Sequence, residues 1–204
     1  MNHTEPTPDR ILAVARGLFA ERGYRGTSVR AITGRAQANL GAVTYHFGSK
    51  EKLYEAVIES LVGPLEARVR AVVDGPGTPL ERIRRTAGLL VEHLGSHEEQ
   101  AAIIQHELAR QRELPARAQR WVAFLFESLC RLIAEGQAEG SIAAGSPPLL
   151  AAAVAAQPFY LAMVGHRFAE MAGFPGRSAL ADPQVVEHVQ LMVDRLLAAS
   201  RRDA

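Results

Sequence analysis

The chain lacks most features of secreted, membrane and β-sheet proteins. It has one cysteine, Cys130, in 204 residues, which excludes an internal disulfide framework and is typical of a reducing cytoplasm. No apolar run reaches the ~18 residues that span a membrane, no secretory segment opens the sequence, and no alternating β-branched run indicates a strand. We expect a cytoplasmic protein without membrane contact, with Cys130 as a small buried residue and redox sensing as the alternative.

The pattern that fills the chain is helical. Apolar residues make up 48% and aromatic residues 6%, and the many alanines suit closely packed helices. A chain of this length can hold one small module and a second domain with its own core. Gly, Pro and Ser clusters divide it into about nine helices, so the expected fold is all-α; the later helices are expected at 50–73, 79–95, 97–112, 115–139, 147–172 and 183–201.

Residues 27–47 predict a helix-turn-helix. A first short helix has one apolar face, formed by Val29, Ile32 and Ala36, and Thr27 or Ser28 stands at its N-cap. Helices of this kind also occur as ordinary hairpins inside helical proteins, which is the alternative. The flanking sequence favours a DNA reader, because a support helix precedes the motif and a capped fourth helix follows it at 48–54; the support helix carries a Thr7-Pro8 start and the stripe Ile11, Ala15, Leu18 and Phe19.

The second short helix of the motif is too polar to be core. Asn39 is expected to cap it, with Leu40, Val43 and Phe47 pointing inward. The remaining side chains are left outside, where a recognition helix would meet the major groove; they are Gly41, Ala42, Thr44, Tyr45 and His46.

Residues 9–56, about a quarter of the chain, contain a dense set of residues at characteristic spacing: Ala13, Leu18, Phe19, Gly23, Tyr24, Thr27, Ser28, Val29 and Ile32, then Gly41, Val43, Tyr45, His46, Phe47, Ser49, Lys50, Glu51 and Leu53. This set resembles the N-terminal signature of the TetR family of bacterial transcriptional regulators. Two residues depart from the signature: Gln37 stands where the family usually has the turn glycine, and Ala38 replaces the usual valine. The resemblance implies a helix-turn-helix domain at 1–52 and an effector-binding and dimerisation domain at 53–204.

The charge of the chain is divided unevenly. The net charge is +1, but residues 1–52 contain eight Lys/Arg and four Asp/Glu, a local charge of +4. Residues 53–204 contain fifteen Lys/Arg and eighteen Asp/Glu, a charge of −3. A basic surplus at one end is expected of a chain whose N-terminal part meets phosphates.

Within the expected helix-turn-helix domain, which we call the reader, a hydroxyl at a helix start can hold a phosphate. We assign this role to Thr27 and Ser28, and Lys50 adds a positive charge nearby. The resemblance implies phosphate or sugar contacts for Tyr45 and His46. The resemblance also implies base reading by the positions that match the family's groove-facing ones: Arg30, Leu40, Gly41, Ala42 and Thr44. Arg30 suits guanine, with a solvated surface charge as the alternative; for Tyr45 the alternative is a packing role between helices. The expected DNA-binding residues are Thr27, Ser28, Arg30, Asn39, Leu40, Gly41, Ala42, Thr44, Tyr45, His46 and Lys50.

The last two long helices are expected to form a homodimer interface. One short recognition helix reads few base pairs, so two-fold partners on a palindrome are the usual solution, and the resemblance implies the same two helices. A core inside one chain would show the same periodicity. The expected interface residues are Leu150, Val154, Phe159, Val185, Val189, Met192, Val193 and Leu196.

An effector site is expected in the second domain, for a mainly apolar or aromatic molecule. Each candidate could equally be plain core; they are His93, Ile104, Trp121, Phe124, Leu125, Phe159 and Met163. The pair His93 and His97 has ligand-like spacing, but it straddles Gly95-Ser96, so we expect no shared face and no metal. No nucleophile elbow, phosphate loop or dinucleotide motif is present, and we expect no cofactor and no catalysis.

The sequence therefore predicts a ligand-responsive repressor that a small molecule releases from a palindromic operator. Ligand and DNA would have to prefer different conformers. The alternative is a helix-turn-helix regulator without a ligand, controlled by its abundance or by a protein partner. A helical enzyme is a third class, for which the sequence offers no site.

Overall fold

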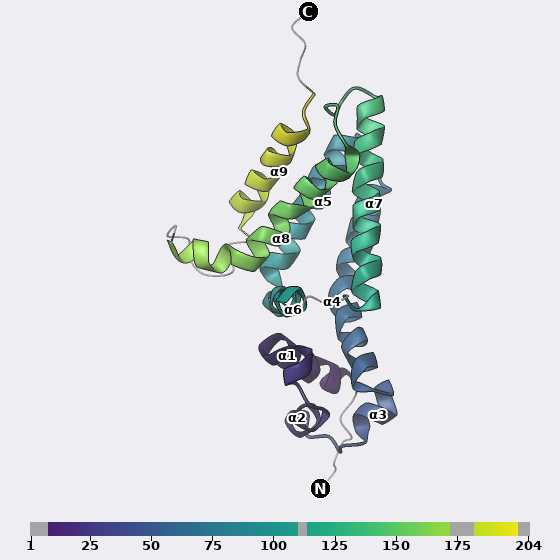
Figure 1. Cartoon of the computed structure of the whole chain (residues 1–204), viewed down its shortest axis with the longest axis vertical. Coiled ribbons are helices and arrows are strands. Elements are labelled where there is room, and N and C mark those ends of the chain that lie inside the picture. The colour runs from purple at the N-terminus through teal and green to yellow at the C-terminus, as the bar shows by residue number, and fades with distance from the viewer. Residues whose placement is uncertain (1–7, 110–113, 172–181, 200–204) are drawn as a thin grey trace, which may run out of the picture. The chain divides into compact units, whose positions relative to one another are not determined.

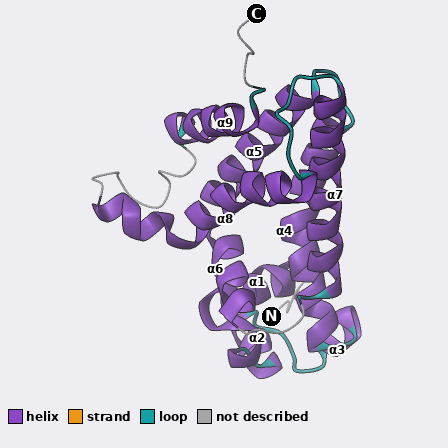
Figure 2. Cartoon of the chain, turned by 45° about the horizontal axis from the view of Figure 1, so that its top comes forward, coloured by secondary structure: helices purple, strands orange, loops and turns teal. Residues whose placement is uncertain are grey.

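The computed structural model describes residues 8–109, 114–171 and 182–199. Over these residues the fold is all-α, as the sequence predicts, and contains no strand (Figure 2). None of the described helices is both long and apolar enough to cross a membrane. The helices are α1 (Pro8–Gly26), α2 (Val29–Arg35), α3 (Ala42–Phe47), α4 (Lys50–Val73), α5 (Pro79–Ser96), α6 (Glu98–Ala109), α7 (Ala116–Ala138), α8 (Pro147–Met171) and α9 (Pro183–Leu197).

The chain folds into two compact units, and each unit is built from two separate segments of the sequence. The first unit contains residues 1–63 and 99–119, and the second contains residues 64–98 and 120–204. Helix α4 crosses from one to the other between Gly63 and Pro64, and α6 belongs to the first unit from residue 99. The units therefore differ from the functional division at residue 52, which stays a prediction.

The first unit is built on α1. Its apolar stripe is fully buried, as the spacing predicts, and α1 packs on α2, which in turn contacts α3 (Figure 1). Each large apolar side chain that is removed from water here contributes roughly 1.5–3 kcal/mol. Burial of this stripe fixes α2 and α3 on one side of α1; the buried residues are Ile11, Ala15, Leu18, Phe19, Ile32, Ala36 and Val43.

Helix α1 is interrupted near its end by Gly23, whose backbone has φ 68° and ψ 174°. Residues other than glycine rarely adopt this backbone conformation. A Cβ here would also lie 3.3 Å from the imidazole of His106 on α6. The break is closed by Thr27, whose buried hydroxyl donates to the carbonyls of Leu18 at 3.0 Å and Gly23 at 2.9 Å.

In the second unit α5 packs against both α8 and α9. Val154 of α8 and Val189 and Val193 of α9 are buried within this chain. Helix α9 ends at Leu197, four residues before the expected end, because Ala198 leaves the helical conformation and pairs with Ile142.

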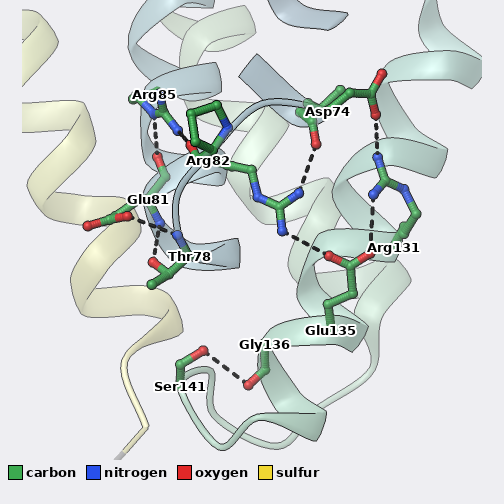
Figure 3. Close-up of polar contacts among 11 residues, drawn as sticks. Asp74, Thr78, Glu81, Arg82, Arg85, Arg131, Glu135, Gly136 and Ser141 are labelled. Carbon is green, nitrogen blue, oxygen red and sulfur yellow. Dashed lines mark hydrogen bonds and ion pairs between the residues drawn. The ribbon is translucent and has the colours of Figure 1, made fainter. Parts of the chain in front are cut away.

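The connection between α4 and α5 is tied to α7 by polar contacts (Figure 3). Arg82 of α5 donates to the Val73 carbonyl at 3.0 Å and to Glu135 of α7 at 3.1 Å. Arg131 of α7 bridges Asp74 and Glu135, each at 3.1 Å. These contacts fix the end of α4 to two other helices of the second unit.

Helix α5 begins with a reciprocal cap. The Thr78 hydroxyl accepts from the Glu81 N–H at 3.3 Å, and the Glu81 carboxylate accepts from the Thr78 N–H at 2.9 Å. The hydrogen bond from this backbone N–H lowers the pKa of Glu81. Because the folded-state pKa is lowered, the carboxylate stabilises the fold above the usual pKa of glutamate and loses this effect as the pH falls through the lowered value.

We expect Thr78→Ala to lower the free energy of unfolding by about 1 kcal/mol, because it leaves the Glu81 N–H without its acceptor. The measurement is urea denaturation followed by far-UV circular dichroism. Thr78→Ser keeps the hydroxyl and is the matched control, which should stay within a few tenths of a kcal/mol of the wild type. Equal loss in both variants would contradict the role given to the hydroxyl.

Candidate nucleic-acid interface

The N-terminus of α2 offers an exposed, capped helix start. Ser28 is its N-cap, and the Ser28 Oγ accepts from the Ala31 N–H at 3.1 Å. Ser28 and Arg30 are both exposed. Of the two residues expected at this cap, Ser28 therefore holds it.

Thr27 is buried, whereas its expected contact with a phosphate requires an exposed hydroxyl. Its residue is 1% exposed, and its hydroxyl serves the internal bonds that close the end of α1. The expectation that its side chain holds a phosphate is wrong for this conformation, because the local break at Gly23 turns the hydroxyl inward.

The turn after α2 is made by Gln37, which has φ 51° although it is not glycine. The Gln37 N–H donates to the Gly34 carbonyl at 3.2 Å, and the Ala38 N–H donates to the Thr33 carbonyl at 2.8 Å. Arg10 of α1 donates to the Gln37 carbonyl at 3.4 Å. The turn keeps the left-handed geometry that glycine would adopt freely, and a glutamine supplies it.

Helix α3 begins later than expected, at Ala42. Its N-cap is Gly41, which makes no side-chain cap, so the expectation that Asn39 caps this helix is wrong. The Asn39 carbonyl instead accepts from the Ala42 N–H at 3.1 Å. Residues 38–41 form the segment that leads into α3. The later start of the helix changes which side chains face outward.

Two orientations on this segment differ from the expected ones. Leu40, expected to point inward, is 62% exposed, whereas Ala42, expected outside, is 7% exposed. The later helix start explains both, because Leu40 then lies before the helix and Ala42 shares its inner face with Val43. Phe47, also expected inward, is half-buried. Ala42 is therefore covered in this conformation, and Leu40 is available to a partner.

The exposed side of α3 and its approach forms one polar and aromatic surface. Tyr45 is 83% exposed, and its ring lies 4.9 Å from that of His46, in an edge-to-face arrangement. The other exposed members are Asn39, Leu40, Gly41 and Thr44. A short helix with an amphipathic outer face has the geometry for base edges, phosphates and thymine methyl groups.

Helix α4 begins beside this surface. The Ser49 Oγ accepts from the Lys52 N–H at 3.1 Å, as expected of a cap. The Lys50 ammonium lies 4.1 Å from the centroid of the Tyr24 ring. Sequence reasoning included Lys50 but missed Tyr24, whose position after Gly23 gave no sign that it would contact a charge.

Comparison with known proteins agrees with this geometry. Residues 11–57 match the family described as bacterial regulatory proteins, tetR family. The HTH-type transcriptional repressor KstR2 of Mycobacterium tuberculosis is 36% identical over 100 residues, which cover 49% of this chain and 50% of that protein. The chain thus spans about half the length of the curated relatives it matches first. The matched N-terminal part of the chain, residues 11–57, thus belongs to the TetR family of bacterial regulatory proteins.

Solved structures share the fold over nearly the whole chain. The structure of ketosteroid transcriptional regulator KstR2 of Mycobacterium tuberculosis has a TM-score of 0.74 and 24% identity, covering 94% of both chains. FadR from Bacillus subtilis, solved in complex with stearoyl-CoA, has a TM-score of 0.71 and 19% identity, covering 91% of this chain and 96% of that one. The TetR family and the matched relatives are transcriptional regulators, not enzymes.

The residues expected to bind an effector are distributed between the units. Ile104 lies in the first unit, while His93, Trp121 and Leu125 are buried in the second. The half-buried Phe124 ring is covered by the Arg70 guanidinium at 3.8 Å. Phe159 is half-buried, and the side chain of Met163 lies outside the described residues.

The structure places the two histidines that were considered as a ligand pair. His93 and His97 do share a face, contrary to the sequence argument, because α5 continues to Ser96 and the rings stack at 4.0 Å. His97 Nδ1 lies 2.8 Å from the His93 carbonyl. No group of three metal-ligating side chains occurs among the described residues.

Cys130 is half-buried, and burial raises the pKa of its thiol.

We expect Gln37→Gly to raise the free energy of unfolding by about 0.5–1 kcal/mol, because glycine adopts a positive φ without the steric cost that glutamine pays. Urea denaturation followed by circular dichroism measures it. Gln37→Ala is the control, since alanine loses the side chain but keeps the steric cost. A gain as large in Gln37→Ala would contradict the backbone explanation.

Proposed function

We propose that this TetR-family chain is a homodimeric repressor that binds a palindromic operator and is controlled by a small molecule. The observation that carries this proposal is the exposed surface of α3, bordered by the Ser28 cap and by Lys50. Tyr45, the most exposed large side chain of this surface, is 83% exposed. Leu40 on the same surface is 62% exposed, and apolar side chains that are grouped on a surface mark an interaction site.

Roles within the reader follow from chemistry and exposure. Ser28, Tyr45, His46 and Lys50 carry donors that suit phosphate oxygens. Arg30 suits the O6 and N7 atoms of guanine, and the Leu40 and Thr44 methyl groups suit thymine methyls. Gly41 allows close approach to the backbone. Thr27 and Ala42 support the surface from within instead of contacting DNA through their side chains.

The proposed dimer uses the outer faces of α8 and α9. Val154, Val189 and Val193, which were expected at the interface, are buried inside the chain, and Leu196 is exposed. Leu150, Phe159, Val185 and Met192 are half-buried. The expected interface residues therefore lie partly in the core of this chain and partly at the edge of that core. A second stripe, on the outer side of α8, is exposed: Leu149, Ala152, Ala153, Ala156 and Tyr160.

This α8 face has the composition of a helix-packing surface. Its members recur at intervals of three and four, so they form one continuous side of the helix. The small alanines let a second helix approach closely, and Tyr160 is 57% exposed. A hollow of about 400 Å³ adjoins the face between α8 and α9, lined by Ala156, Gln157, Tyr160, Leu161, His188 and Val189. Two copies related by a two-fold axis would cover these patches with each other.

The proposed effector is a large, mainly apolar molecule. The candidates Trp121 and Leu125 give the second unit an apolar interior, with the buried His93 as a polar group. KstR2 is named as a ketosteroid regulator and FadR binds stearoyl-CoA in its solved complex. The ring system of a ketosteroid and the acyl chain of stearoyl-CoA are both large and apolar, so steroids and long-chain acyl thioesters are the first compounds to test.

The second candidate function is a regulator that responds to no small molecule. Mobility shift of the operator, repeated with a ketosteroid and with stearoyl-CoA, separates the two. Release of the DNA by one compound at constant salt supports ligand control. If a broad set of apolar compounds leaves the complex intact and produces no thermal stabilisation of the protein, control by abundance or by a protein partner becomes the better proposal.

Selection of DNA fragments by the full-length protein should yield a palindrome. On that duplex, we expect Thr44→Ala to change the preferred base at a symmetric pair of positions, by about 1–3 kcal/mol of discrimination at most. Lys50→Ala should weaken all sequences alike and flatten the slope of log Kd against log salt by about 0.9 per protomer. The proposed roles fail if both variants bind the palindrome as the wild type does.

We expect Ala156→Glu to dissociate the dimer at least about 100-fold more readily, because a two-fold interface would bury two uncompensated carboxylates. Sedimentation of the protein over a concentration series measures the equilibrium. Ala134→Glu, at an exposed position of α7, is the matched control and should leave the dimer unchanged. An Ala156→Glu protein that stays dimeric would move the interface elsewhere.

A further inference from the structure

We propose that Tyr24, Tyr54 and Glu107 position the Lys50 ammonium for a DNA phosphate and make this contact depend on helix α6. The inference rests on the proposed DNA-binding function and names a way to regulate it. All four side chains belong to the first unit. They connect α4, the end of α1 and α6 through three successive contacts.

The first contact orders the lysine. The Lys50 Nζ lies 4.1 Å from the centroid of the Tyr24 ring, within the range in which a ring quadrupole attracts a cation. A lysine side chain otherwise has many rotamers, and fixing it on binding costs free energy. An ammonium that is already held on a ring face meets a phosphate with less of this loss, so the ring strengthens the contact without touching DNA.

The second contact fixes the Tyr24 ring itself. Its centroid lies 4.9 Å from that of Tyr54 and 6.0 Å from that of Phe19. The Phe19 and Tyr54 rings meet edge to face at 4.8 Å. Tyr54 is 4% exposed and Phe19 is fully buried, so two anchored rings support the one that faces the lysine.

The third contact brings in α6. The Tyr54 hydroxyl donates to Glu107 Oε1 at 2.8 Å, and Glu107 is 6% exposed. A carboxylate that is buried to this degree depends on its hydrogen bonds. His106, the neighbouring residue, places its Nε2 3.2 Å from the Ala20 carbonyl. Glu107 therefore sets the orientation of Tyr54, and α6 is held against the aromatic cluster.

The course of the chain gives this arrangement a regulatory meaning. Helix α6 begins at Glu98, and residue 98 is the last of the second unit before the chain enters the first. A shift of α6 that weakens the Glu107–Tyr54 bond would loosen the rings and then the lysine. Such a shift would lower affinity for the phosphate backbone and leave base preference unchanged, because phosphates carry no sequence information directly.

The test is a double-mutant cycle on DNA binding by the full chain. The variants are Tyr54→Phe, Lys50→Met and the double variant, and the probes are the selected operator and an unrelated duplex of equal length. Tyr54→Phe keeps the ring but loses the hydroxyl that Glu107 accepts from. We expect it to weaken both duplexes by the same factor, about three- to tenfold, and to reduce the salt slope. In the Lys50→Met background it should change nothing further.

A second pair of variants approaches the lysine from its other side. Tyr24→Leu removes the ring face but keeps the ammonium, so it should weaken both duplexes and move the salt slope part of the way toward that of Lys50→Met. Tyr24→Phe keeps a ring and should restore the wild-type slope. This pair tests the proposal even if Tyr54→Phe does not fold. Circular dichroism and sedimentation, recorded for every variant, show which variants are folded.

Several outcomes would overturn the inference while leaving the proposed function intact. Tyr54→Phe could bind as the wild type does, weaken binding equally with Lys50 present or absent, or alter base preference instead of the salt slope. In each case the tyrosine has no role through Lys50. If the wild type binds neither duplex at low salt, the proposed function itself fails and this inference fails with it.

Discussion

The reader depends on the burial of the α1 stripe against α2. Helix α3 has six residues, far fewer than an isolated helix needs in water, so its conformation is imposed by what it rests on. Ile11, Leu18 and Ile32 are buried almost completely, and α2 contacts α3. Because Val43 and Ala42 supply the buried side of α3, the polar residues beside them are held toward solvent. Without the α1 core there would be no ordered surface to present Tyr45 and His46.

Much of this unit could be predicted from the sequence, because caps and apolar spacing are local signals. Ser28 and Ser49 cap α2 and α4 as expected, and the family resemblance follows from the same residues. The start of α3 could not be predicted, because the cap signal in the sequence lies on Asn39, whereas the N-cap is Gly41, which has no side chain to mark it. The reversed orientations of Leu40 and Ala42 follow from this later start, and Thr27 is turned inward by the break at Gly23.

The second unit was harder to predict for a different reason. An apolar stripe at helical spacing has the same pattern whether it packs inside one chain or between two chains. Val154, Val189 and Val193 satisfy the pattern and are core, while the exposed face of α8 is built largely of alanine, which hydrophobicity alone ranks low. The membership of α6 in the first unit has no local signal, because the bond between Tyr54 and Glu107 joins residues far apart in the sequence.

A regulator gains from controlling a phosphate contact instead of a base contact. Base contacts define the operator, so a signal that disturbed them would redirect the protein to other sites as well as release it. Phosphate contacts contribute affinity that is uniform over sequences and additive in the salt dependence. Because each protomer carries one Lys50, a dimer would lose two such contacts together, and modest changes multiply on the operator. Coupling is reciprocal, so DNA that draws Lys50 into place would in turn favour the α6 position that holds Glu107 against Tyr54, and an effector would have to overcome that preference.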